Sequence, residues 1–114
     1  MKYGTIITAI FCLILELTPG HVKRILDGDT FALYHVGIPS EERVRVLGVD
    51  TPERGQPLSA EATAFTTTWL QAGPFTLTAC KRDGFGRLLG ALTRGEDDLA
   101  ESLLKQGLAV PGKW

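Results

Sequence analysis

The chain has 114 residues, 44% of them hydrophobic and 22% charged, a composition typical of one globular domain and not of a disordered segment. Its formal net charge is −1, whereas nucleic-acid binders usually carry a basic excess. If the partner is a polyanion, the positive charge that meets it must therefore be local, or come partly from a metal ion.

The first twenty residues have the order of a secretory signal. Lys2 is followed by an apolar run over residues 6–15 and then by Thr18-Pro19-Gly20. The run is shorter than the ~20 residues of a transmembrane helix. We expect residues 1–20 to be a signal peptide, cut before His21, and residues 21–114 to be the mature domain of a secreted or periplasmic protein. A retained membrane anchor and a buried first element are the alternatives.

The expected state of the two cysteines depends on removal of this signal peptide. Cys12 lies inside it, so Cys80 is expected to be alone in the mature chain, without a disulfide framework. A single cysteine between apolar residues and threonines is most often a small core residue.

The first half of the mature chain has the pattern of short strands. Residues 22–26 and 30–36 are rich in β-formers and flank Asp27-Gly28-Asp29, a strong hairpin signal. Residues 43–49 alternate apolar and charged side chains and predict a third strand.

The second half alternates helices and strands. Residues 59–70 predict a helix that Ser59 could cap, and Gly107 stands where a helix over residues 97–106 should end. Two further strands are predicted between these helices, over residues 75–81 and 88–93.

The predicted order is three strands, a helix, two strands and a helix. Periodicity alone supports a small β-rich domain with two helices. Five short strands with a helix after the third also fit an OB-fold. We therefore expect a mainly β (α+β) fold, a five-stranded OB-fold β-barrel with two helices.

Four stretches of the chain stand out by their residues. They are Asp27-Gly28-Asp29-Thr30, Arg45 with Asp50-Thr51-Pro52-Glu53, Asp83-Gly84-Phe85-Gly86-Arg87, and Leu103-Leu104-Lys105-Gln106-Gly107-Leu108-Ala109. In this order and spacing they resemble conserved segments of the staphylococcal nuclease (thermonuclease) family. The resemblance covers about residues 22–109 and implies an OB-fold, here without the family's third helix, and a calcium-dependent nuclease.

The resemblance implies one Ca²⁺ ion held by Asp29, Asp50 and the carbonyl of Thr51. Calcium prefers such oxygen ligands. Taken singly, Asp29 is better interpreted as a turn residue and Asp50 as a cap. Their occurrence together with the arginines favours the metal.

The resemblance also implies three catalytic residues. Glu53 would activate a water molecule, although Thr-Pro-Glu also fits the start of a helix. Arg45 and Arg87 would clamp the phosphate, because a guanidinium matches two phosphate oxygens at once. Without the resemblance, each arginine could be a solvated surface charge.

Strict strand alternation places Arg45 and Asp50 on opposite faces. Both must address one pocket, so we predict that the strand ends or bulges before Asp50, with Gly48 as the natural position.

Phe85 stands in a Gly84-Phe85 pair where better-known family members have Lys-Tyr. The aromatic ring can still bind substrate by stacking on a base or sugar.

These inferences predict a monomeric phosphodiesterase that cleaves DNA or RNA, single strands preferred, and leaves 3′-phosphates. No stable membrane association is expected after signal removal. The alternatives are a non-catalytic OB-fold module that binds single-stranded nucleic acid, and a secreted interaction domain.

Overall fold

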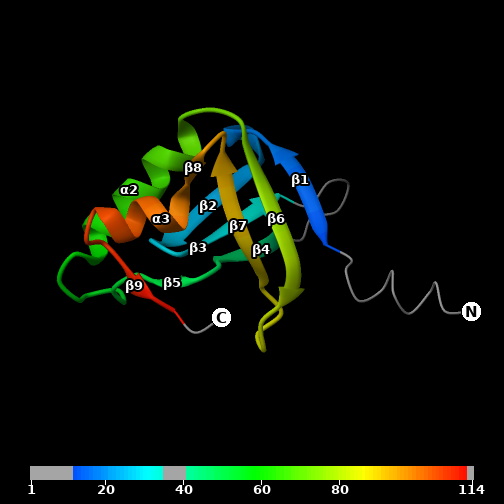
Figure 1. Ribbon diagram of the computed structural model, residues 1–114. Helices are drawn as coiled ribbons and strands as arrows, with labels where there is room; N and C mark the ends of the chain where they lie inside the picture. The colour runs from blue at the N-terminus through cyan, green and yellow to red at the C-terminus, as the bar shows by residue number, and fades with distance from the viewer. Residues whose placement is uncertain (1–11, 35–40, 113–114) are drawn as a thin grey trace, which may run out of the picture.

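The computed structural model describes residues 12–34 and 41–112, which form an α+β fold built on one antiparallel-rich sheet (Figure 1). Within those residues the main sheet has seven strands, in the order β1-β6-β7-β4-β3-β2, with β8 paired to β7. The strands are β1 (Leu13–Leu17), β2 (Val22–Asp27), β3 (Thr30–Tyr34), β4 (Glu41–Val46), β6 (Phe75–Arg82), β7 (Leu88–Arg94) and β8 (Asp97–Asp98). A second sheet pairs β5 (Val49–Asp50) with β9 (Val110–Pro111), and the helices are α2 (Ser59–Gln71) and α3 (Leu99–Lys105).

The predicted fold class is confirmed, but the barrel is not closed by strand pairing. The two edge strands, β1 and β2, are consecutive in the chain and are separated by the 3₁₀ turn η1 (Pro19–His21). Pro19 has no N–H to donate to a ladder, so the chain turns here instead of continuing as one long first strand. The structure is therefore an open, curved sheet where we predicted five strands in a ring.

Helices α2 and α3 lie together against one side of the sheet (Figure 1). Alternation along β6 sends Phe75, Leu77 and Ala79 into the core, and α2 adds Trp69 and Leu70. Trp69 is thus a core residue. Among the described residues, neither helix is long and apolar enough to cross a membrane.

The β2–β3 hairpin is locked to α2. Its two-residue turn carries Gly28, whose carbonyl accepts a hydrogen bond from Thr66 Oγ1 of α2 at 2.6 Å. A Cβ at Gly28 would lie 2.8 Å from Cβ of Ala62 and 2.9 Å from Cγ2 of Thr51. Only glycine allows this close approach, which fixes the position of the next residue, Asp29.

The helix ends differ in part from the prediction. Leu58, in the left-handed conformation with φ 71°, caps α2, and Ser59 is its first helical residue. Asp98 caps α3 by accepting a hydrogen bond from the Glu101 N–H, while residues 97–98 add a short strand to β7. Gly107 has φ 71°, which confirms the predicted left-handed position after the second helix.

The end of the apolar run and the two residues after it form strand β1, which pairs with β6. Leu17 is buried, and Leu13 and Leu15 pack against the core. In the structure residues 13–17 are a strand of the sheet, and the signal peptide over residues 1–20 stays a prediction. A cut before His21 would remove β1, and residues 1–11 lie outside the described part of the chain.

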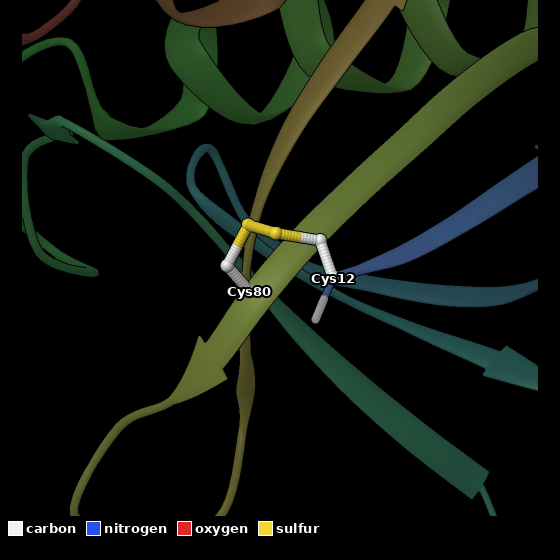
Figure 2. The surroundings of a disulfide bond; sticks show 2 residues. All are labelled: Cys12 and Cys80. Carbon is white, nitrogen blue, oxygen red and sulfur yellow. A yellow bond between two sulfur atoms is a disulfide. The ribbon is translucent and has the colours of Figure 1, made fainter. Parts of the chain in front are cut away.

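Cys80 is disulfide-bonded to Cys12, which corrects the expectation of an unpaired core cysteine (Figure 2). Leu13 lies opposite Ala79 in the β1–β6 ladder, so Cys12 and Cys80 are brought to the same point. The β6–β7 register shifts between Ala79 and Lys81. Cys80 is the extra residue of that bulge, and its exposed side chain meets the end of β1 instead of entering the core.

Candidate active site

The site begins where β4 ends. The strand stops at Val46, and Gly48, with φ 89°, turns the chain before β5 brings in Asp50. Arg45 Nη2 donates a hydrogen bond to Asp50 Oδ1, so the predicted break at Gly48 is confirmed. Arg45 is buried, and its Nη1 donates to the carbonyls of Val46 at 3.1 Å and Val49 at 2.8 Å.

Asp29 lies beside the same guanidinium, with 3.3 Å between its Oδ2 and Arg45 Nη2. Its Oδ2 accepts the Thr51 N–H at 2.9 Å and its Oδ1 accepts the Thr30 hydroxyl at 3.0 Å. Burial disfavours the charged form of Asp29, but hydrogen bonds from Asp27 and Thr51 and the charge of Arg45 outweigh burial and lower its pKa. Asp29 is therefore held as an anion.

Asp27 lies at the site, although the sequence pattern indicated no role for its side chain there. Its Oδ1 accepts the backbone N–H of Asp29 at 3.0 Å. Burial, and then the interaction with the Asp29 carboxylate, raise the pKa of Asp27. The two carboxyl groups interact closely, which raises the pKa of Asp27 and lowers that of Asp29.

Arg87 is positioned by Asp83, a second residue that sequence reasoning passed over. Arg87 Nε donates to Asp83 Oδ2 at 2.6 Å, and Asp83 Oδ1 accepts the N–H groups of Phe85 at 2.8 Å and Arg87 at 3.0 Å. Burial opposes the charge on Asp83, but these hydrogen bonds outweigh it and lower its pKa. The Arg87 guanidinium also lies over the Phe85 ring, 5.3 Å from its centroid. An aspartate at the start of a Gly-rich turn is the signal that could have identified Asp83.

The side chains of Asp27, Asp29, Arg45 and Arg87 line one cavity of about 940 Å³. Glu53 and Phe85 are exposed at this cavity, with Phe85 86% accessible. All seven predicted site residues line it, and their roles stay predictions. The lining residues are Leu26, Asp27, Asp29, Thr30, Arg45, Asp50, Thr51, Glu53, Arg54, Phe85 and Arg87.

The donor set around the cavity fits a hard cation. Asp27, Asp29, Asp50 and Glu53 contribute carboxylates to one cavity, and calcium prefers such oxygens. The Thr51 hydroxyl is buried there without a hydrogen-bond partner in the described part of the chain. As placed, the carboxylates bond to Arg45 and to backbone N–H groups, and within residues 12–34 and 41–112 no three acidic, histidine or cysteine side chains form a ready metal cage. The residues fit calcium by their chemistry, and a bound ion would share Asp29 and Asp50 with Arg45.

Comparison with known proteins places these residues in a family. The family model described as "Staphylococcal nuclease homologue" matches residues 43–113. The chain is 36% identical to the thermonuclease of Staphylococcus intermedius over 96 residues, which cover 77% of this chain and 56% of that protein. It is 35% identical to the thermonuclease of Staphylococcus hyicus, with the same coverage, and 35% identical to endonuclease YncB of Bacillus subtilis, with 77% of this chain and 45% of that protein covered. The chain spans about half the length of these curated relatives.

Proposed function

The chain belongs to the family of staphylococcal nuclease homologues, and from this premise we propose that it is a nuclease that hydrolyses phosphodiester bonds of DNA or RNA. The observation that carries the proposal is the convergence of two arginines, a buried aspartate anion and an exposed glutamate on one open cavity. Relatives named thermonuclease and endonuclease support it.

The arginines bind the scissile phosphate. Arg45 is anchored by two backbone carbonyls and two carboxylates, so its guanidinium is held rigidly in the cavity wall. Arg87 faces the same cavity from the β6–β7 turn. Two guanidinium groups suit the negative charge that grows on the equatorial phosphate oxygens during displacement.

Glu53 is the proposed general base. Its carboxylate takes a proton from water as the water oxygen bonds to phosphorus, and the bond from phosphorus to the 5′ oxygen breaks. The 5′ oxygen takes a proton from solvent while Arg87 hydrogen-bonds to it. The products are a 3′-phosphate and a 5′-hydroxyl end.

We propose Asp29, Asp50 and the Thr51 carbonyl as the residues that would hold one Ca²⁺ ion. The ion would supply positive charge to the phosphate and orient the attacking water. Single strands are the proposed preferred substrate, because unpaired bases are free to stack on the exposed ring of Phe85. The proposed active form is a monomer.

The test is cleavage of a single-stranded oligodeoxynucleotide by the purified chain, with calcium and then with chelator. We expect cleavage that calcium supports, that chelator stops and that yields 3′-phosphate ends. Glu53→Gln should lower turnover by ~10²–10⁴-fold, while Glu61→Gln, an exposed glutamate on α2 outside the cavity, serves as the matched control.

Two outcomes would contradict the proposal in different ways. A folded protein that binds the strand but does not cleave it would be a non-catalytic OB-fold binding module. Equal turnover in Glu53→Gln and the parent would remove Glu53 from the mechanism.

We further propose that the protein works outside the cytosol, in the secreted or periplasmic space, because disulfide bonds such as Cys12–Cys80 persist in oxidising compartments. N-terminal sequencing of the exported protein tests the proposed boundary. A start at His21 gives a domain without β1 and with an unpaired Cys80. A start at or before Cys12 keeps both the strand and the disulfide.

A further inference from the structure

A cluster of basic side chains lies beside the active-site cavity and has no role in the chemistry above. Lys23 and Arg24 come from β2 and Arg43 from β4, and all three form ion pairs with Glu41. The distances to its carboxylate oxygens are 3.2 Å from Lys23 Nζ, 2.7 Å from Arg24 Nη2 and 3.1 Å from Arg43 Nε. Three cations around one carboxylate leave two positive charges in excess.

The strand register places this cluster on the same sheet face as the site. Residues directly opposite in an antiparallel pair share a face. Asp27 and Arg45 both lie opposite Thr30, which makes one cross-strand row in the cavity wall.

The next row on that face lies two residues further along β3 and β4. On β2 it lies three residues further, because the register shifts between Ile25 and Asp27. Arg24 and Arg43 both lie opposite Ala32, which is fully buried between them. Two residues along a strand correspond to about 7 Å. The basic row is therefore an immediate neighbour of the catalytic row, on the same surface.

The three cations are accessible to a ligand. The side chains of Lys23, Arg24 and Arg43 are 36%, 49% and 48% exposed, whereas that of Glu41 is 18% exposed. Tyr34, opposite Glu41, adds an aromatic side chain that is 56% exposed on the same face. Basic groups next to an exposed aromatic ring suit a nucleic-acid strand, which offers phosphates and base faces in alternation.

We propose that Lys23, Arg24 and Arg43 form a second phosphate-binding subsite, which holds nucleotides adjacent to the one that is cleaved. The inference rests on the proposed nucleic-acid substrate. It also explains how a chain of net charge −1 binds a polyanion: the positive charge is concentrated in one row that continues the active site. Glu41 holds the three cations close together by ion pairs, and the bound phosphate interacts with the same three cations.

The experiment measures binding without cleavage. The Glu53→Gln protein is titrated with a fluorescent 20-nucleotide single strand at several salt concentrations, and the slope of log K against log [salt] is recorded. Each phosphate contact contributes ~0.7 to that slope for a single strand. Adding Arg24→Gln and Arg43→Gln should reduce the slope by about 1.4 and weaken binding of the 20-mer more than binding of a dinucleotide.

Two further variants make the test specific. Glu41→Gln removes the negative charge from the cluster and should tighten binding of the 20-mer. Lys105→Gln removes a cation that is paired with Glu101 on α3 and is 72% exposed, and it should leave the slope unchanged.

Circular dichroism verifies that each variant is folded, and the single variants Arg24→Gln and Arg43→Gln replace the double variant if it is not. An unchanged slope and affinity in a folded double variant would overturn the subsite, as would a Glu53→Gln protein that does not bind the strand. If the chain with Glu53 intact binds with the expected slope but does not cleave, the subsite is retained and the proposed nuclease activity is refuted.

Discussion

Arg45 and Asp50 are ion-paired, although their separation of five residues would place them on opposite faces of a regular strand. The pair exists because β4 ends at Val46 and the chain turns at Gly48 before β5. Arg45 holds this turn itself through the carbonyls of Val46 and Val49. One buried side chain thus both shapes the loop and presents its charge to the cavity.

Arg45→Lys should therefore lose stability as well as activity. A lysine keeps the charge but cannot reach two carbonyls and two carboxylates in one plane. Leaving buried acceptors unpaired should lower the free energy of unfolding by ~1–3 kcal/mol, as urea denaturation would measure. Arg43→Lys, at an exposed position of the same strand, is the matched control. Equal stability of both variants would mean that Arg45 does not hold the turn.

The elements that the sequence predicted well are those whose signal is local. The hairpin at Gly28, the amphipathic strand β6 and the glycine after α3 follow from turn chemistry and period. The break at Gly48 was predictable because two side chains had to meet, which is a constraint from function.

The elements that were missed depend on partners distant in the chain. β1 was not predicted as a strand, because an apolar run is the same whether it enters a membrane or a sheet, and its partner β6 lies about 60 residues away. The disulfide was missed because Cys12 was assigned to the predicted signal peptide. Asp83 and Asp27 were given no role at the site, because their contacts with Arg87 and Asp29 arise from the folded loop geometry.

Gly28→Ala should disturb the site by separating the β2–β3 hairpin from α2. The added methyl group would lie within 3 Å of Ala62 in α2 and of Thr51, so the hairpin and helix must separate. Overpacking of this kind costs ~1–3 kcal/mol, and it moves Asp29. We expect a lower melting temperature and weaker calcium dependence of cleavage. Gly84→Ala, where an added Cβ meets nothing within 4 Å, is the control. An unchanged melting temperature for Gly28→Ala would argue against the close packing.

Asp83→Asn tests whether Asp83 positions Arg87. Asparagine keeps one oxygen for the two backbone N–H groups, but its amide cannot accept the hydrogen bond from Arg87 Nε. Turnover should fall about tenfold or more, as expected for a loss of ~1.4 kcal/mol or more in transition-state binding. The decisive readout is a double-mutant cycle. Asp83→Asn should have no further effect once Arg87 is alanine, whereas additive losses would show that Asp83 acts independently.

The Cys12–Cys80 bond should contribute substantially to stability, because it closes 68 residues of chain and fixes the edge strand β1. Loss of a disulfide of this kind typically costs ~2–4 kcal/mol. The double variant Cys12→Ser/Cys80→Ser should therefore melt lower than the oxidised parent. A reductant should lower the melting temperature of the parent and leave that of the variant unchanged. Equal melting of the parent with and without reductant would mean that β1 holds to β6 without the covalent bond.

Glu41 should titrate far below an ordinary glutamate. Hydrogen bonds from Arg24 and Arg43 lower its pKa from 4.5 to about 2. The folded-state value is depressed, so the stabilising contribution of the cluster is present above pH 4.5 and is lost as pH falls from there through about 2. Carboxyl ¹³C NMR of Glu41 measures this midpoint directly. In Arg24→Gln/Arg43→Gln the midpoint should rise toward 4.5, and in Lys105→Gln it should stay near that of the parent. A midpoint near 4.5 in the parent would show that the three cations do not gather around Glu41 in solution, which would leave the second subsite without its organising residue.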